Sequence, residues 1–283
     1  MLVFTGISKI VLLPLALCLS ACSNLTSLFF YPQTQYIRTP EDINLQYEIV
    51  SLTASDGVVL NAWWLPAQND IDVPSEKKPT VLFLHGNAEN ISTHIGSVYW
   101  LPEEGVNVLL LDYRGYGTSE GIPVLPDIFK DIEAAVVWIQ AEYPESPMFV
   151  LGQSIGAALA AYAAPTLSQQ YPIEGLILDA GFSGYRAVAR EVTSQGLISA
   201  ILLWPMTWLL PTDWDGEDHI AGLSPAPLLM FHSPDDQTVP YHSGQRLFEA
   251  AAEPKRWIDS QGRHIQTFNF PEMRTELVNF LFQ

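Results

Sequence analysis

The sequence predicts a single α/β domain with a mostly parallel sheet that begins with antiparallel strands. Three observations favour this fold. Short, almost wholly apolar runs lie at residues 80–84, 106–111, 148–151, 176–178 and 228–231, and strands of this kind are buried on both faces of a parallel sheet. Segments of helical length separate the runs, so helices are expected to cross over between neighbouring strands. The chain has 283 residues, a length that α/β enzymes reach as one unit.

An antiparallel pair of strands is expected at the start of the domain. Residues 47–54 and 58–65 read as strands, and Ser55-Asp56-Gly57 between them is a tight-turn sequence. The sheet would therefore begin with a hairpin and continue with parallel strands.

Helices are expected between the buried strands. Apolar residues recur at close to helical spacing within residues 128–140. Residues 154–168 are rich in alanine, which is a strong helix former. A last strand is expected at residues 256–259. This alternation is typical of a doubly wound sheet, with helices on both faces.

One connection is too long for a simple crossover. About fifty residues separate Asp179, at the end of one buried strand, from Pro227, at the start of the next. Within this stretch residues 197–210 are strongly apolar, but the segment is too short for a transmembrane helix and Pro205 interrupts it. We expect a helical cap at about residues 182–226, inserted over the carboxyl edge of the sheet.

The first 21 residues have the pattern of a signal peptide. Lys9 precedes an apolar run at residues 10–19, which is too short to span a bilayer comfortably. The string Leu19-Ser20-Ala21-Cys22 follows and resembles the lipobox of bacterial lipoproteins. This resemblance implies cleavage before Cys22, a diacylglyceryl group on its thiol and an acylated amine. The alternative is an ordinary secretory signal that happens to precede a cysteine.

Lipidation of Cys22 would divide the chain into a signal peptide at 1–21, a lipidated tether at 22–40 and one main domain at 41–283. Two or more acyl chains hold a protein firmly, because each buried methylene contributes about 0.8 kcal/mol. Ser23, not aspartate, follows the cysteine, which in Gram-negative lipoproteins favours the outer membrane. We therefore expect a lipid-anchored protein of the bacterial cell envelope that faces the periplasm.

The composition excludes several other kinds of site. A formal net charge of −18 provides no basic surface that could displace counterions from nucleic acid. Cys18 would leave with the signal peptide and Cys22 would be modified, so no cysteine would remain for a disulfide or a thiolate metal site. His94 and His219 have no spacing that indicates a metal. No cofactor is expected, and the sequence does not indicate an oligomeric state.

A nucleophilic serine is predicted at position 154. The string Gly152-Gln153-Ser154-Ile155-Gly156 matches the pattern G-x-S-x-G, in which a serine lies on a tight, strained turn and the glycines leave room where side chains would clash. The pattern alone also fits a plain strand–turn–helix. Here a predicted strand enters the turn and an alanine-rich predicted helix leaves it, which is the context that an exposed nucleophile requires.

Two more strings complete a resemblance to the α/β-hydrolase superfamily. His85-Gly86-Asn87 follows the first buried strand. The segment 112–121, DYRGYGTSEG, follows the second and resembles the family's D-x-R-G-x-G-x-S loop; no lysine follows it, as a phosphate-binding loop would need. With the serine pattern, these strings are similar to the serine-aminopeptidase-like and membrane-associated acyl-hydrolase branch. The resemblance covers roughly residues 47–283 apart from the cap, and implies an α/β-hydrolase fold.

The resemblance implies a triad in the chain order serine, acid, histidine. In many members the acid follows the next-to-last core strand in the pattern H-G-x-x-D-x-x-V-P. Asp236 is the acid whether one counts forward from the histidine of this pattern, His232, or backward from its V-P pair, Val239-Pro240. Ser233 replaces the glycine of this pattern, so the loop can differ slightly. Asp235, one residue earlier, and Asp179, at the end of the preceding strand, remain alternatives.

The base is expected to be His264. Only His242 and His264 follow the acid in the chain. His242 comes directly after the acid loop and is too near in sequence to reach Ser154. His264 lies beyond the last predicted strand, in a loop that contains a glycine. The resemblance also assigns the backbone N–H groups of Asn87 and Ile155 to the oxyanion hole and gives His85 a structural role.

These residues favour a serine hydrolase that cleaves a carboxylic ester or thioester through an acyl-enzyme. Its expected partners are a small-molecule or acylated substrate and, through Cys22, a membrane. Among enzymes, the alternative is a serine peptidase or amidase. The alternative from a different class of function is a catalytically idle envelope protein that binds a ligand. Many activities share this fold and triad, so the natural substrate does not follow from them.

Overall fold

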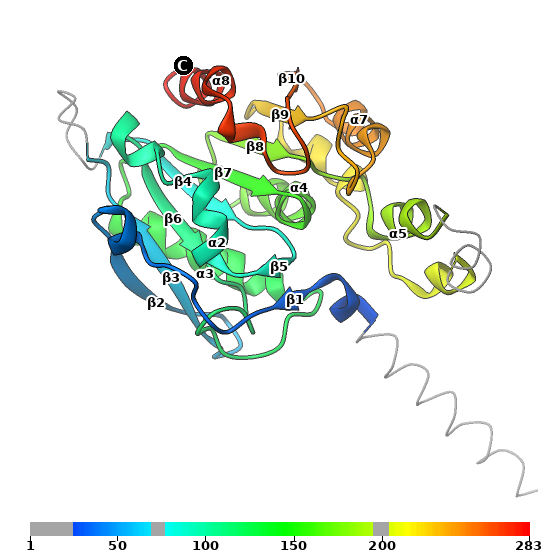
Figure 1. The fold of residues 1–283 in the computed structure, drawn as a ribbon, viewed down its shortest axis with the longest axis horizontal. Helices are drawn as coiled ribbons and strands as arrows, with labels where there is room; N and C mark the ends of the chain where they lie inside the picture. The colour runs from blue at the N-terminus through cyan, green and yellow to red at the C-terminus, as the bar shows by residue number, and fades with distance from the viewer. Residues whose placement is uncertain (1–24, 69–76, 195–203) are drawn as a thin grey trace, which may run out of the picture.

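The computed structural model describes residues 25–68, 77–194 and 204–283. Its central sheet has eight strands (Figure 1). They are β2 (Glu48–Thr53), β3 (Val59–Leu65), β4 (Thr80–Leu84), β6 (Asn107–Leu111), β7 (Met148–Gln153), β8 (Gly175–Asp179), β9 (Leu228–His232) and β10 (Lys255–Asp259). The order across the sheet is β10-β9-β8-β7-β4-β6-β3-β2.

The strands have the directions that the sequence predicts. The pairs β2–β3 and β3–β6 are antiparallel, and the other five neighbouring pairs are parallel. All five apolar runs are strands, and every residue of β4, β6, β8 and β9 is buried. The prediction of a mostly parallel sheet with an antiparallel start is confirmed.

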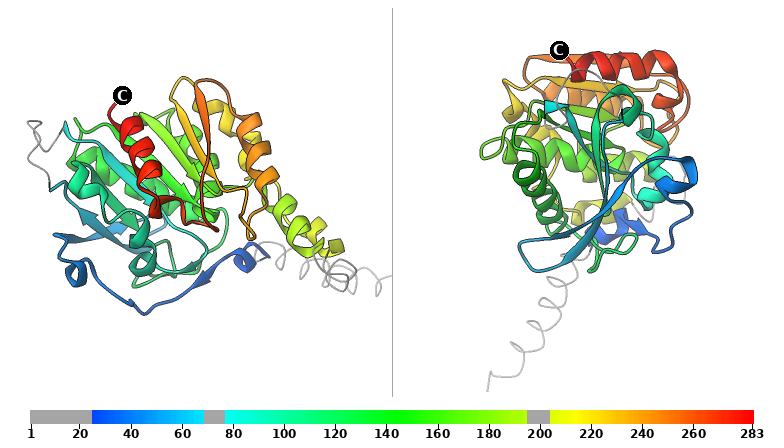
Figure 2. Two further views of the ribbon diagram at one scale, coloured as in Figure 1. Left: turned by 45° about the horizontal axis from the view of Figure 1, so that its top comes forward. Right: turned by 90° about the vertical axis from the view of Figure 1, so that its left-hand side faces the viewer.

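Helices cover both faces of the sheet, and Figure 2 shows the layers from two further directions. One core contains the apolar faces of α3 (Ile128–Glu142) and α4 (Ile155–Leu167). The other contains residues of α2 (Ile91–His94) and α8 (Pro271–Leu281). Successive residues of one strand enter different cores because side chains alternate across a sheet: Leu82 and Leu84 lie in the first core, and Val81 and Phe83 lie in the second.

The remaining elements are short. Beside β9 lies α7 (Tyr241–Ala250). Single-turn helices in the described part of the chain include η2 (Pro40–Ile43), η4 (Ile95–Ser97), η5 (Leu101–Glu104) and η9 (Thr267–Asn269).

The predicted cap contains two different parts. Near the sheet, η7 (Gly216–Asp218) and η8 (Ile220–Leu223) pack on α4. Farther out, α5 (Tyr185–Ser194) and η6 (Trp204–Leu209) pack against each other and project from one end of the sheet (Figures 1 and 2). We call α5 and η6 the arm. Part of the predicted apolar segment at 197–210 lies outside the described residues.

The N-terminal segment lies along the domain from Leu25 onward, within the predicted tether. The helix η1 (Leu25–Phe29) touches the arm, since the ring centroids of Phe29 and Tyr185 are 5.2 Å apart. The strand β1 (Tyr31–Pro32) then pairs in parallel with β5 (Ala88–Glu89). Cys22 lies outside the described residues. In the part of the chain that the structure describes, no helix is long and apolar enough to cross a membrane.

A buried arginine connects the hairpin to the helical layer. The side chain of Arg114 is 4% exposed, and its Nε and Nη2 atoms donate to Asp131 Oδ1 of α3 at 2.9 and 2.7 Å. Its Nη1 atom donates at 3.0 Å to Asp56, in the turn between β2 and β3. This arginine belongs to the DYRGYGTSEG segment, so part of that motif stabilises the fold.

We predict that Arg114→Gln lowers the free energy of unfolding by about 3–5 kcal/mol, because removal of one partner leaves a buried carboxylate uncompensated. Arg256→Gln is the control, since its partner Glu276 is an exposed side chain and exposed pairs contribute about 0–1 kcal/mol. Urea denaturation of both variants measures the difference. Equal, small losses would contradict a structural role for Arg114.

Candidate active site

Ser154 lies in the turn between β7 and α4. Its backbone angles are φ 57° and ψ −119°, a strained conformation for any residue other than glycine. Its N–H donates to the carbonyl of Asp179 at the end of β8, with a distance of 2.9 Å. The side chain is therefore presented at the carboxyl edge of the sheet, as the G-x-S-x-G pattern predicts.

The two glycines of this pattern have no room for a side chain. A Cβ atom on Gly152 would lie 2.4 Å from the carbonyl oxygen of Gly156. A Cβ atom on Gly156 would lie 2.0 Å from the carbonyl oxygen of Leu84, at the end of β4. The start of α4 thus lies directly against the neighbouring strand, and this close packing fixes the turn.

The structure brings the three residues of the predicted triad together. His264 Nε2 lies 2.9 Å from Ser154 Oγ, and His264 Nδ1 lies 2.7 Å from Asp236 Oδ2. The Asp236 side chain is fully buried, whereas the His264 side chain keeps 17% of its surface exposed. The imidazole can therefore take a proton from the serine while its other nitrogen donates to the carboxylate.

The surroundings of Asp236 keep it ionised. Burial raises the pKa of this carboxyl, but the hydrogen bond from His264 and the backbone N–H groups of Thr238 and Val239 outweigh burial. Those N–H groups donate to Asp236 Oδ1 at 2.8 and 3.0 Å. The net effect is a pKa below the ordinary value of an aspartate, so Asp236 can orient the imidazole and stabilise its protonated form.

The alternative residues lie elsewhere. Asp235 is exposed. His242 lies on α7, where its Nε2 atom is 2.9 Å from Glu191 of α5. Asp179 is buried, but its oxygens accept hydrogen bonds from Gln153 Nε2 at 2.7 Å and Thr267 Oγ1 at 2.6 Å.

Ser233, which replaces a glycine of the family pattern, connects two loops of the site. Its Oγ atom donates to the carbonyl of Gly262 at 2.5 Å, in the loop that carries His264. It also accepts the backbone N–H of Asp235 at 3.1 Å. The departure from the pattern therefore adds a direct contact between the acid loop and the histidine loop.

The two backbone groups assigned to the oxyanion hole are available. Ile155 is the first residue of α4, where backbone N–H groups have no partner within the helix. Within residues 25–68, 77–194 and 204–283, the N–H groups of Asn87 and Ile155 donate to no carbonyl. Helix N-termini also favour negative charge, so the position of Ile155 suits an oxyanion.

Asp179 supports the candidate triad in a way that no sequence pattern indicates. Asp179 accepts hydrogen bonds both from Gln153, next to Ser154, and from Thr267, three residues after His264. Thr267 belongs to no recognisable motif, and Gln153 occupies the variable position directly before the serine in the G-x-S-x-G pattern. Among the described residues, no group of three or more histidine, cysteine, aspartate and glutamate side chains could hold a metal.

The profile of the family described as serine aminopeptidase, S33, matches residues 75–217. The chain belongs to this family of α/β-hydrolases. A relative from Escherichia coli O157:H7, the uncharacterized protein YfhR, is 32% identical and covers 96% of this chain and 92% of its own. The lysophosphatidylserine lipase ABHD12 of Xenopus tropicalis is 27% identical and covers 89% of this chain and 73% of its own.

Solved structures show the same fold. The esterase Pf2001 of Pyrococcus furiosus has a TM-score of 0.69 and 24% sequence identity, with 90% of this α/β-hydrolase and 97% of the esterase covered. An α/β-hydrolase from Vibrio vulnificus has the same TM-score of 0.69 with 18% identity, over 84% of this chain and 82% of its own. The prediction of an α/β-hydrolase fold is confirmed, and the chain is a hydrolase.

We predict that Asp236→Asn lowers kcat by about 10³- to 10⁴-fold, because an amide cannot hold the imidazole in the required tautomer. Asp235→Asn is the matched control, and its effect should stay within about twofold because the side chain is exposed. Steady-state hydrolysis of an activated ester by the two purified variants measures this. A larger loss in Asp235→Asn would move the acid to position 235.

Proposed function

We propose that this α/β-hydrolase is a serine hydrolase that cleaves a carboxylic ester or thioester through an acyl-enzyme. The position of His264 between Ser154 and Asp236, at 2.9 and 2.7 Å, is the observation that carries this proposal. A serine hydroxyl is a weak nucleophile until a base within hydrogen-bond distance takes its proton. The three side chains have the chain order and contacts that such activation requires.

In the proposed reaction Ser154 Oγ attacks the substrate carbonyl as His264 removes its proton. The backbone N–H groups of Asn87 and Ile155 stabilise the oxyanion of the tetrahedral intermediate. His264 then protonates the leaving alcohol or thiol, which departs and leaves an ester on Ser154. A water molecule, deprotonated by His264, attacks this ester and releases the acid, and the serine regains its proton.

Acylated substrates of medium chain length suit the proposed site. The names of two similar proteins, the ABHD12 lipase and the Pf2001 esterase, describe hydrolysis of lipid and ester substrates. The arm carries large apolar side chains that are 39–59% exposed: Trp204, Met206, Trp208 and Leu209. Pockets for small molecules are mostly apolar, so an apolar cap favours an acyl chain over a charged peptide.

A second candidate is a peptidase or amidase. The matching family profile, described as serine aminopeptidase, favours it. Such an activity needs a group that binds the amine of the substrate. The triad itself fits both reactions, and only turnover of defined substrates separates them.

We also propose that Cys22 is lipidated and that the protein is anchored in the bacterial outer membrane, where it faces the periplasm. The lipobox-like string and Ser23 support this. The chain enters the domain at η1, beside the arm, where Leu28 is 62% exposed and Trp208 is 59% exposed. Arg190 Cζ lies 4.4 Å from the centroid of the Trp208 ring. Tryptophan together with arginine is typical of membrane interfaces.

We predict that kcat/KM for p-nitrophenyl esters rises from acetate to a medium-chain ester. Each methylene that the protein buries contributes up to about 0.8 kcal/mol of binding, which is several-fold in kcat/KM. Ser154→Ala should abolish turnover of every ester while the circular dichroism spectrum stays unchanged. The measurements use substrates below their micelle concentrations.

Three results would contradict the proposal in different ways. A maximum at acetate would refute the acyl-chain preference. Faster turnover of aminoacyl amides than of any ester would favour the peptidase. Full activity in Ser154→Ala would refute the nucleophile itself.

We predict that Cys22→Ser prevents incorporation of labelled palmitate and releases the protein from the membrane fraction, because the acyl chains supply the anchoring energy. Wild-type protein expressed in the same cells is the control. Labelling of the variant would place the lipid elsewhere. Tight membrane binding without a label would assign attachment to the exposed apolar side chains of η1 and the arm.

A further inference from the structure

The loop that carries Asn87 is held at four successive carbonyls. We call residues 85–88 the oxyanion loop. Each of its carbonyl oxygens accepts a hydrogen bond from an aromatic or imidazole side chain. The bonds are Tyr113 Oη to His85 O (3.0 Å), His85 Nδ1 to Gly86 O (2.8 Å), Tyr116 Oη to Asn87 O (2.7 Å) and His94 Nε2 to Ala88 O (3.0 Å).

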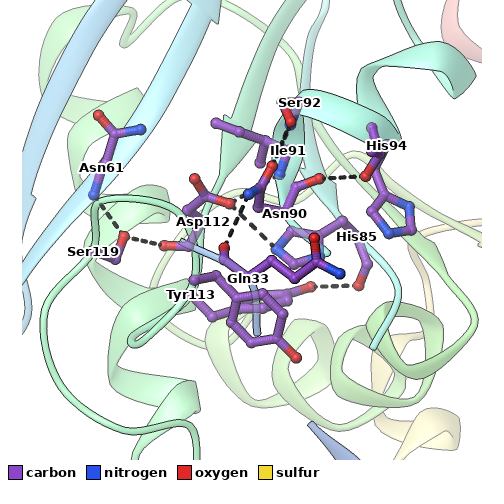
Figure 3. Close-up of polar contacts among 12 residues, drawn as sticks. Gln33, Asn61, His85, Asn90, Ile91, Ser92, His94, Asp112, Tyr113 and Ser119 are labelled. Atoms are coloured by element: carbon purple, nitrogen blue, oxygen red, sulfur yellow. Dashed lines mark hydrogen bonds and ion pairs between the residues drawn. The ribbon is translucent and has the colours of Figure 1, made fainter. Parts of the chain in front are cut away.

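These four rings form one packed group. The centroid of the His85 ring lies 4.4 Å from the ring centroid of Tyr113, 4.9 Å from that of Tyr116 and 5.2 Å from that of His94. Figure 3 shows the side chains of His85, His94 and Tyr113 close to one another. Burial lowers the pKa of both histidines. Each ring is therefore neutral at neutral pH and has one N–H to donate to its carbonyl.

The N-terminal segment holds the same loop from the other side. We call residues 31–37 the strap. The Tyr31 N–H donates to Asn87 O at 2.8 Å, and the Gln33 N–H donates to Glu89 O at 3.0 Å. In return, Asn90 Nδ2 donates to the carbonyl of Gln33 at 2.9 Å. Figure 3 shows Gln33 and Asn90 side by side.

The far end of the strap is also tied to the site. Tyr36 Oη donates to Asp112 Oδ2 at 2.8 Å, and the other oxygen of Asp112 accepts the N–H of Ile91 at 2.9 Å. Asp112 follows β6 directly and is fully buried. The strap, the oxyanion loop and the DYRGYGTSEG segment therefore form one hydrogen-bonded unit.

Two donors from different parts of this unit meet at one oxygen. The carbonyl of Asn87 accepts both the Tyr31 N–H and the Tyr116 hydroxyl. The N–H of the same residue is the group assigned to the oxyanion. The preceding carbonyl, Gly86 O, accepts a hydrogen bond from His85 Nδ1. This carbonyl and the Asn87 N–H belong to the same planar peptide unit. Both peptide units that flank the Cα atom of Asn87 are thus fixed in orientation.

We propose that Tyr116 and the strap are positioning elements of the oxyanion hole, which act by holding Asn87 through its carbonyl. This proposal rests on the proposed serine-hydrolase function. It assigns a role to Tyr116 of the DYRGYGTSEG segment. It also gives the N-terminal residues a role in supporting the active site. These residues connect the domain to the predicted anchor.

The expected loss of catalytic rate can be judged from the effect of removing an oxyanion donor altogether. Loss of one oxyanion donor lowers the rate about 10²- to 10³-fold, because the donor must already point at the position where charge develops. If the donor remains but is held less firmly, the rate should fall by only part of this factor. The effect should lie on kcat, since the oxyanion exists only after the serine has attacked.

Two variants and one matched control test the proposal in the full-length protein. Tyr116→Phe removes the hydroxyl donor and keeps the ring. Tyr31→Pro removes the backbone N–H, whereas Tyr31→Ala keeps it and removes only a side chain that is 60% exposed. The readouts are kcat and KM for an activated ester and inhibition by a trifluoromethyl ketone, which forms a tetrahedral adduct with a catalytic serine.

We expect kcat to fall about 10-fold in Tyr116→Phe and in Tyr31→Pro, with KM within about twofold, because only part of one donor's effect is lost. Inhibition by the trifluoromethyl ketone should weaken by a similar factor to kcat. Tyr31→Ala should have the kcat and the inhibition of the wild type. Wild-type kcat in both Tyr116→Phe and Tyr31→Pro would overturn the proposal. A change in KM alone, or equal losses in Tyr31→Ala and Tyr31→Pro, would also overturn it.

Hydrogen exchange separates this proposal from the proposed function. Exchange of the amides at 85–92 should rise in Tyr31→Pro and not in Tyr31→Ala, whether or not the protein hydrolyses esters. If the wild type has no activity that depends on Ser154, the proposed function fails. If that activity is present and the loop exchanges equally in both Tyr31 variants, only the role of the strap fails.

Discussion

The backbone of Ser154 is the constraint on which the site depends. Its φ of 57° is unfavourable for a residue with a side chain, and it persists because the surrounding elements leave no alternative. Gly156 lies against the carbonyl of Leu84, and the Ser154 N–H is bonded to the carbonyl of Asp179. The turn is thus held between β4 and β8, the two strands beside β7. That single arrangement presents the serine hydroxyl and turns the N-terminus of α4 towards it.

The buried side chain of Asp179 connects the turn that carries Ser154 to the loop that carries His264. It accepts hydrogen bonds from Gln153, beside the serine, and from Thr267, beyond His264. Burial raises its pKa to about 6, although both hydrogen bonds lower it. A carboxyl of this kind is costly to bury unless its oxygens are satisfied. Asp179 therefore supports the site by fixing two loops relative to each other, while the proposed acid, Asp236, contacts His264 directly.

The sequence predicted the sheet well because β4, β6, β7, β8 and β9 are buried on both faces, which requires continuous apolar runs. It predicted the tight turn at Ser154 because close packing at Gly152 and Gly156 excludes any other residue. It did not predict the strap, because the bonds of Tyr31 and Gln33 to the loop use backbone atoms that any sequence carries. Nor did it predict the bond from Thr267 to Asp179, since a hydroxyl at one position has no periodic or spaced pattern.

In the proposed reaction Ser154 is the residue that becomes acylated. Reaction of the wild-type protein with a fluorophosphonate, followed by proteolysis and mass spectrometry, tests it most directly. We expect one covalent adduct, on the peptide that contains Ser154, and none when His264 is replaced by alanine, because the serine is then not activated. An adduct on a different residue would show that Ser154 is not the nucleophile, and undiminished labelling without His264 would show that His264 is not its base.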